Sequence, residues 1–141
     1  MKPYGRHKNL WTKNINGPVV KTVKIPLTGP SSLAGGGSFA WTNPEPYDIV
    51  INRVTVDVTT KSTAASTLSV GTAASLTTSS PNLIDTLNTG AAAVTTDNLQ
   101  TPGTNGKQLQ RLSAGGFVTG TVATGTSVGI VGNVYLEYFT L

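Results

Sequence analysis

Few residues in this chain have side chains that could carry out chemistry, and they are widely spaced. Residues 125–129, Gly-Thr-Ser-Val-Gly, match the G-x-S-x-G pattern that surrounds the nucleophilic serine of many hydrolases. That pattern works with a strand before the serine, a helix after it, and an acid and a histidine later in the chain. Here a strand is expected after Ser127, and the single histidine, His7, precedes it. We therefore interpret the pattern as a turn between strands.

Metal and cofactor sites are also hard to assemble from this sequence. There is no cysteine, and His7 lies between two cationic residues with no carboxylate nearby. The six acidic residues include one close pair, Glu45 and Asp48, whereas glycosidases and metal sites need clustered carboxylates or other ligands. Residues 33–38, Leu-Ala-Gly-Gly-Gly-Ser, lack the lysine and the spacing of a phosphate-binding loop. The sequence thus predicts no metal, no cofactor and no enzymatic activity.

Charge is distributed unevenly along the 141 residues. The chain has 10 Lys and Arg residues against 6 Asp and Glu residues, and only 11% of its residues are charged. Six basic residues precede the first acidic residue, Glu45: Lys2, Arg6, Lys8, Lys13, Lys21 and Lys24. The N-terminal segment is therefore cationic and the remainder slightly acidic. This asymmetry indicates an arm with a partner of its own, although a solvated tail has the same composition.

Residues 1–17 are predicted to form an extended basic arm, because Pro3, Gly5 and the run Asn16-Gly17-Pro18 interrupt any helical pattern. A segment that includes a tryptophan is more typical of a contact than of a solvated tail. We expect the arm to contact a neighbouring subunit or another protein through Tyr4, Arg6, Lys8, Leu10, Trp11, Lys13 and Ile15. Aromatic residues among basic ones also suit nucleic acid, but the rest of the chain offers no basic face, so that partner is not expected.

Residues 18–141 are predicted to form a single all-β domain. Apolar and polar residues alternate with the period of two that a half-buried strand requires, most clearly at Val54, Val56 and Val58. Short strands joined by Gly, Thr and Asn turns favour an antiparallel β-sandwich, jelly-roll-like in strand number, or a small barrel. Strands are expected at residues 19–27 (an edge strand, because of Pro26), 38–42, 49–60, 67–70, 92–95, 107–112, 117–123 and 127–141.

Three finer features are predicted within this domain. Residues 67–70 are expected to pair antiparallel with the strand before them. Residues 82–87, Asn-Leu-Ile-Asp-Thr-Leu, have the spacing of a helical turn, with Pro81 as part of a start signal. Gly129 and Gly132 indicate a bulge or a close backbone approach within the last strand.

Several segments together resemble small structural proteins encoded in the head-gene region of tailed bacteriophages, including capsid decoration, or cement, proteins. These segments are VDVTTKSTAASTLSVGTAAS, NLIDTLNTGAAAV, GTNGKQLQRL and GGFVTGTVATGTSVGIVGNVYLEYF, within residues 48–141. The resemblance implies a β-rich body on the outside of a virion head, bound to the major capsid protein, commonly as a homotrimer and without an active site. The arm lies outside the resemblance.

Two other functions remain open at this stage. A receptor-binding or carbohydrate-binding β-sandwich module of a phage tail or fibre would stack aromatic rings on a sugar, and Phe39, Trp41 and Tyr47 are the clustered candidates. A tail-tube subunit would also be rich in strands. The sequence has no run of about 20 apolar residues and no signal peptide, so we expect a protein made in the host cytoplasm that does not enter a membrane.

Overall fold

Strands form where apolar and polar side chains alternate, and the computed structural model, which describes residues 18–29 and 37–141, has nine of them. They are β1 (Lys21–Leu27), β2 (Phe39–Thr42), β3 (Ile49–Thr60), β4 (Ser66–Ala73), β5 (Ile84–Asn88), β6 (Val94–Asp97), β7 (Gln110–Leu112), β8 (Phe117–Gly125) and β9 (Val131–Thr140). No helix long and apolar enough to cross a membrane occurs in the described residues.

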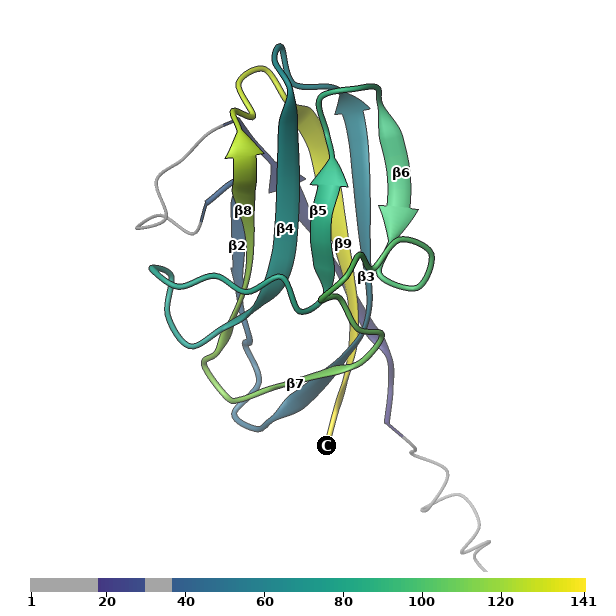
Figure 1. The fold of residues 1–141 in the computed structure, drawn as a ribbon. Helices are drawn as coiled ribbons and strands as arrows, with labels where there is room; N and C mark the ends of the chain where they lie inside the picture. Colours follow the sequence, from purple (N-terminus) through teal and green to yellow (C-terminus); the bar gives the residue numbers. More distant parts are fainter. Residues whose placement is uncertain (1–17, 30–36) are drawn as a thin grey trace, which may run out of the picture.

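The strands form two antiparallel sheets that pack face to face (Figure 1). One sheet has the order β1-β9-β3-β6, with β7 paired to the first residues of β3, and the other has the order β2-β8-β4-β5. This is the strand order of a jelly roll, a sandwich of two sheets built from Greek keys. The prediction of an all-β sandwich is therefore confirmed. The small-barrel alternative is wrong, because the two sheets do not close on each other.

The core lies between the sheets, and β3 shows how the sequence places side chains in it. Ile49 and Ile51 are buried, and then Val54, Val56 and Val58 are buried. The buried positions change from odd to even numbers where the pairing of β3 with β9 shifts register, between Ile51 and Arg53. An irregularity of this kind inserts one residue and lets both halves of a long strand face the same core.

Most of the predicted strands are present. β3 has the predicted bounds, and β1 is an edge strand in which Pro26 is exposed. The close backbone approach expected in the last strand occurs at Gly132, where a Cβ atom would lie 2.1 Å from the carbonyl oxygen of Asp57. The strands expected at residues 92–95 and 107–112 are shorter or displaced, and appear as β6 and β7.

Two of the finer predictions are wrong. Residues 82–87 do not form a helical turn: Ile84–Asn88 is strand β5, with Thr86 at a positive φ of 56°. This residue and the register shift between β4 and β5 place apolar side chains at helix-like intervals within a strand. Residues 67–70 also do not pair with the strand before them, because the chain crosses after β3 into the other sheet, where β4 pairs with β8 and β5.

The start of β1 and the C-terminal residue mark one end of the sandwich. β1 begins where β9 ends, since Lys21 pairs with Tyr138. The β2–β3 loop lies at the same place, because the backbone N–H of Leu141 donates a hydrogen bond to the carbonyl oxygen of Asp48 over 3.2 Å. We call this end, at the bottom of Figure 1, the terminal end.

Candidate interaction surface

Ser127 of the G-x-S-x-G pattern lies in the turn between β8 and β9, and a strand follows it, as predicted. Its side chain is 1% exposed, and its Oγ atom lies 3.5 Å from the Oγ of Ser38, which is also buried. The turn is closed by Gly125 and Gly129, both at positive φ. The Ser127 hydroxyl therefore connects two segments of the sandwich, and the turn explains the glycines of the pattern.

The close carboxylates Glu45 and Asp48 do not act together, because each is bound to a different cation. Glu45 Oε1 accepts hydrogen bonds from Lys21 Nζ at 2.5 Å and from the Tyr138 hydroxyl at 3.1 Å. The bond from Lys21 and that from Tyr138 outweigh partial desolvation and hold the pKa of Glu45 below its usual value. The same contact with Glu45 raises the pKa of Lys21. This group ties β1, the β2–β3 loop and β9 together at the terminal end.

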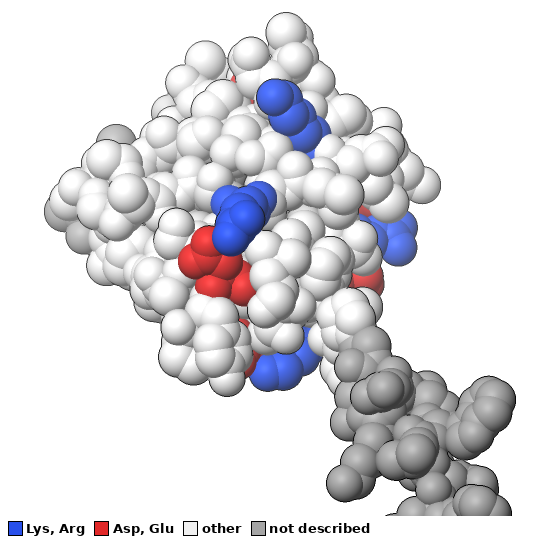
Figure 2. Space-filling view, turned by 90° about the horizontal axis from the view of Figure 1, so that it is seen from below, with Lys and Arg blue, Asp and Glu red and all other residues white. Residues whose placement is uncertain are grey.

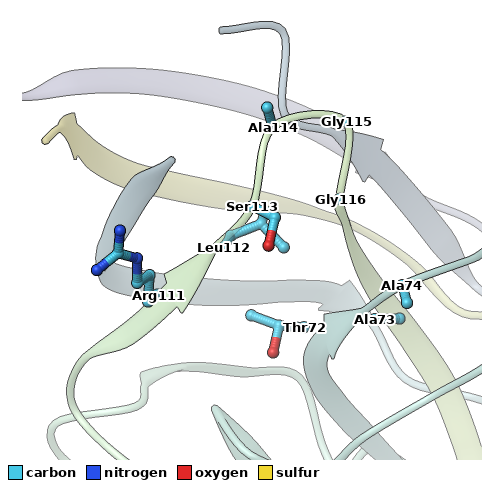
Figure 3. Close-up of a pocket in the computed structure, with 9 residues that line it drawn as sticks. All are labelled: Thr72, Ala73, Ala74, Arg111, Leu112, Ser113, Ala114, Gly115 and Gly116. Carbon is cyan, nitrogen blue, oxygen red and sulfur yellow. The ribbon is translucent and has the colours of Figure 1, made fainter. Parts of the chain in front are cut away.

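Asp48 binds the strand and loop that border a shallow hollow. Its Oδ2 accepts a hydrogen bond from Arg111 Nε at 2.9 Å, and its Oδ1 accepts one from the backbone N–H of Ala114 at 3.3 Å. The hollow has a volume of about 320 Å³ (Figure 3). Its lining is Thr72, Ala73, Ala74, Arg111, Leu112, Ser113, Ala114, Gly115 and Gly116. Small side chains and backbone predominate, and the one cation is already paired, so the hollow offers a ligand few directed contacts.

The three aromatic residues considered for sugar stacking are not arranged as a platform. Phe39 is buried in the core, against the backbone of Gly120. Trp41 is half-buried against the core, and its ring centroid lies 5.1 Å from that of Tyr138. Tyr47 is exposed at the terminal end. Two of the three rings are therefore used in packing the sandwich.

Exposed apolar side chains gather at the terminal end. Tyr47 and Leu141 adjoin Asp48, and Val19 and Val20 directly precede Lys21; these four side chains are between 51% and 70% exposed. Figure 2, which views the molecule from this end, shows a mostly uncharged surface on which most basic groups lie beside acidic ones. Such a patch, next to the start of β1, is typical of a protein contact.

Charged side chains are divided unequally between the sheets. β2, β4 and β8 contain none, and Asp85 in β5 is the one charged residue of their sheet. The other sheet contains Lys21, Lys24, Arg53, Asp57, Asp97, Arg111 and Glu137. The described residues have equal numbers of basic and acidic side chains, six each, because four of the ten basic residues fall within residues 1–17. The formal charge of +4 therefore belongs entirely to the predicted arm.

Sequence reasoning missed a buried polar group beside β3. Asp97 is 3% exposed and binds the Arg53 guanidinium, and its Oδ1 accepts hydrogen bonds from the backbone N–H groups of Leu99 and Gln100, each at 2.8 Å. Burial acts to raise the pKa of Asp97, but these hydrogen bonds outweigh it and leave the pKa below its usual value. The signal in the sequence was the Asp97-Asn98 pair at the end of a strand, typical of an Asx turn.

The predicted contact residues of the arm, Tyr4, Arg6, Lys8, Leu10, Trp11, Lys13 and Ile15, lie outside the described residues. Within residues 18–29 and 37–141, no three His, Cys, Asp or Glu side chains are grouped so as to bind a metal ion. Comparison of the chain with models of known families, with curated protein sequences and with solved structures gives no match.

Proposed function

We propose that this protein is a structural virion protein that decorates the outside of a phage head, bound to the major capsid protein and without enzymatic activity. The observation behind the proposal is the distribution of charge between residues 1–17 and the β-sandwich domain. An electrically neutral sandwich follows a segment that holds the whole formal charge of +4. That division suits a body that covers a lattice and an arm that attaches it.

The terminal end supports an attachment role. The arm joins the body at Pro18, beside the exposed side chains of Val19, Val20, Tyr47 and Leu141. An apolar patch next to a cationic segment can combine a buried contact with electrostatic steering, which mainly raises the association rate toward an acidic surface. The Lys21–Glu45–Tyr138 group would hold the base of the arm against the body.

The jelly-roll fold is compatible with this role but does not decide it, because the same fold serves viral capsid and lectin domains. The sugar-binding alternative would need an aromatic platform, but Phe39 is buried in the core and Trp41 is half-buried against it. We therefore give the decoration role precedence over that of a receptor-binding module.

The test is binding of the full chain to shells assembled from the major capsid protein of the phage that encodes it. We expect saturable co-sedimentation and a rise in the temperature at which the shells dissociate, because a ligand that binds only the assembled state stabilises it. Binding should weaken as salt concentration rises, since the arm is cationic. Absence of co-sedimentation at low salt, or binding to isolated tails instead of heads, would refute the proposal.

A further inference from the structure

We infer that Asn105 is a site of spontaneous deamidation, that Asp85 slows this reaction, and that its product loosens the loop that covers the edge of strand β5. Asn105 is exposed in the segment between β6 and β7, and Gly106 follows it. An asparagine followed by glycine is the dipeptide in which the side-chain amide reacts most readily with the next backbone nitrogen. The inference does not depend on what the protein binds, and so goes beyond the proposed function.

Residues 102–107 cover the free edge of β5, which is the last strand of its sheet. The backbone N–H of Asp85 donates a hydrogen bond to the carbonyl oxygen of Pro102 at 2.8 Å, and that of Lys107 donates to the carbonyl oxygen of Asn82 at 3.0 Å. Natural sheets often cover an edge strand with a loop, because unpaired N–H and C=O groups invite pairing with another chain. The loop therefore has a structural role at the edge of β5.

Gly106 is required by the packing of this loop. A Cβ atom there would lie 2.0 Å from the carbonyl oxygen of Pro102 and 2.6 Å from that of Leu83, so no other residue fits without displacing the backbone. The same missing Cβ leaves the nitrogen of Gly106 unshielded from the side chain of Asn105. No described residue accepts a hydrogen bond from the Gly106 N–H. The packing of the loop thus places the most reactive successor after Asn105.

Deamidation at this site needs only water. The Gly106 backbone nitrogen gives its proton to solvent and attacks Cγ of Asn105, and the bond from Cγ to Nδ2 breaks as Nδ2 takes up a proton and leaves as ammonia. The product is a cyclic succinimide. Water then adds to one of its two carbonyl carbons and opens the ring to aspartate or to isoaspartate, in which the main chain passes through the side-chain carboxyl group. No electron is transferred, and the net exchange is water for ammonia.

Asp85 restrains the reactive amide. Its Oδ2 accepts hydrogen bonds from Asn105 Nδ2 at 2.6 Å and from the backbone N–H of Asn105 at 3.2 Å. Hydrogen bonds to a charged group are among the stronger ones, so the amide seldom leaves Asp85. The carboxylate also opposes the negative charge that develops on the Gly106 nitrogen and then on the amide oxygen. Both effects slow the reaction.

The product of deamidation is incompatible with this contact. The reaction replaces Nδ2, a donor, by a carboxylate oxygen that only accepts hydrogen bonds. Two carboxylates then face each other across the former hydrogen bond, and like charges repel. Isoaspartate also inserts a methylene group into the main chain, next to the close backbone contact at Gly106. We expect the loop to loosen and the N–H of Asp85 to become exposed to solvent.

The first test follows deamidation of the full chain in mildly alkaline buffer, by mass spectrometry of the peptide that contains Asn105. We expect Asn105 to react at least about tenfold more slowly in the folded chain than in concentrated urea, where the contact with Asp85 is lost. Asp85→Ala should raise the rate in the folded chain about tenfold. Asp57→Ala is the matched control, since it removes a strand carboxylate that Thr95 binds in the other sheet, and it should leave the rate unchanged.

A second measurement keeps the inference testable if Asp85→Ala folds poorly. Asn105→Asp imitates the product, and it should speed hydrogen exchange at the N–H of Asp85 by about tenfold or more, as expected for the loss of a hydrogen bond to a charged group. Asn88→Asp adds the same charge at the end of β5 and should leave this exchange unchanged. Combining Asn105→Asp with Asp85→Asn restores a donor and an acceptor, and should return exchange to the wild-type rate.

Three outcomes would overturn the inference. They are equal rates of deamidation in the folded and unfolded chains, no acceleration in a folded Asp85→Ala variant, and unchanged hydrogen exchange in Asn105→Asp. Shell binding enters none of these measurements, so a failure of the proposed function would be distinguishable.

Discussion

Trp41 and Tyr138 contact each other across the sandwich, with ring centroids 5.1 Å apart and ring planes inclined at 49°. Trp41 belongs to β2 and Tyr138 to β9, so this contact joins an edge strand of one sheet to a central strand of the other. The Tyr138 hydroxyl also donates to Glu45, which binds Lys21 at the start of β1. A single aromatic pair thus connects both sheets to the region where the arm begins.

The first prediction concerns this pair. Trp41→Ala should lower the free energy of unfolding by about 3 kcal/mol, at the low end for large aromatic truncations because the ring is only half-buried. Tyr138→Phe keeps the ring and loses one hydrogen bond, so it should cost about 1 kcal/mol. Urea denaturation followed by circular dichroism measures both. If Trp41→Ala left stability unchanged and abolished binding to a glycan, the ring would belong to a sugar site.

A second prediction follows from the lowered pKa values of Glu45 and Asp97. Each carboxyl binds its proton less tightly in the folded state than in the unfolded state, so its contribution to stability is present above the unfolded pKa, near 4. That contribution is lost as pH falls through the folded pKa. Stability should therefore decrease steadily below about pH 4.5. Asp97→Asn and Glu45→Gln should each flatten the curve of unfolding midpoint against pH; Asp57→Asn is a comparison at an exposed carboxylate bound by Thr95.

The strands were predictable because their alternation directly reflects one buried and one exposed face. Val54, Val56 and Val58 gave β3 its bounds, and Pro26 identified β1 as an edge strand. The irregularity in the pairing of β3 with β9 was not predicted, although the buried positions change parity between Ile51 and Val54. Alternation of apolar and polar residues does not identify the neighbouring strand. The crossing of the chain from β3 to the other sheet was therefore not predicted.

Residues 82–87, which were predicted to form a helical turn, show why spacing alone can mislead. Leu83, Ile84 and Leu87 are all buried, and their spacing of one, three and four residues is that of a helical face. A strand produces the same spacing when one residue, here Thr86, takes a positive φ.

The third prediction concerns Gly71 in the centre of β4. A Cβ atom there would lie 1.9 Å from the carbonyl oxygen of Ser80, so Gly71→Ala must displace the β4–β5 loop from the sheet. We expect a loss of about 2 kcal/mol or more, as for overpacking in a core. Gly29→Ala is the control, because its nearest atom would be 3.7 Å away. Thermal unfolding of the two variants should separate them clearly; equal midpoints would contradict the packing described for the loop.

The fourth prediction concerns Asn98, which is fully buried after β6. Its Oδ1 accepts from the backbone N–H of Val54 at 2.8 Å, and its Nδ2 donates to the carbonyls of Lys107 and Gln108 at 3.0 and 2.9 Å. Asn98→Asp keeps the acceptor but removes both donors and places a carboxylate against two carbonyl oxygens. It should destabilise the protein by about 3 kcal/mol or more, and hydrogen exchange should increase in the loop before β7. Asn88→Asp, at an exposed position, should change stability little.

The last prediction addresses the arm. Deleting residues 1–17 removes the whole formal charge of +4 and leaves a neutral body whose described strands and loops form a buried apolar core. The truncated chain should therefore keep its unfolding midpoint within a few degrees, while its affinity for the shell falls by a factor of about 30 or more, because a buried aromatic anchor is worth about 2 kcal/mol. Trp11→Ala in the full chain should reproduce most of that loss without changing the salt dependence.

Replacing Lys2, Arg6, Lys8 and Lys13 by glutamine should instead lower the association rate and remove the salt dependence, since charges at the rim of a contact act chiefly on encounter. If the truncated chain bound the shell as tightly as the full one, residues 1–17 would be a solvated tail. If it lost affinity for DNA alone, the partner of the arm would be nucleic acid.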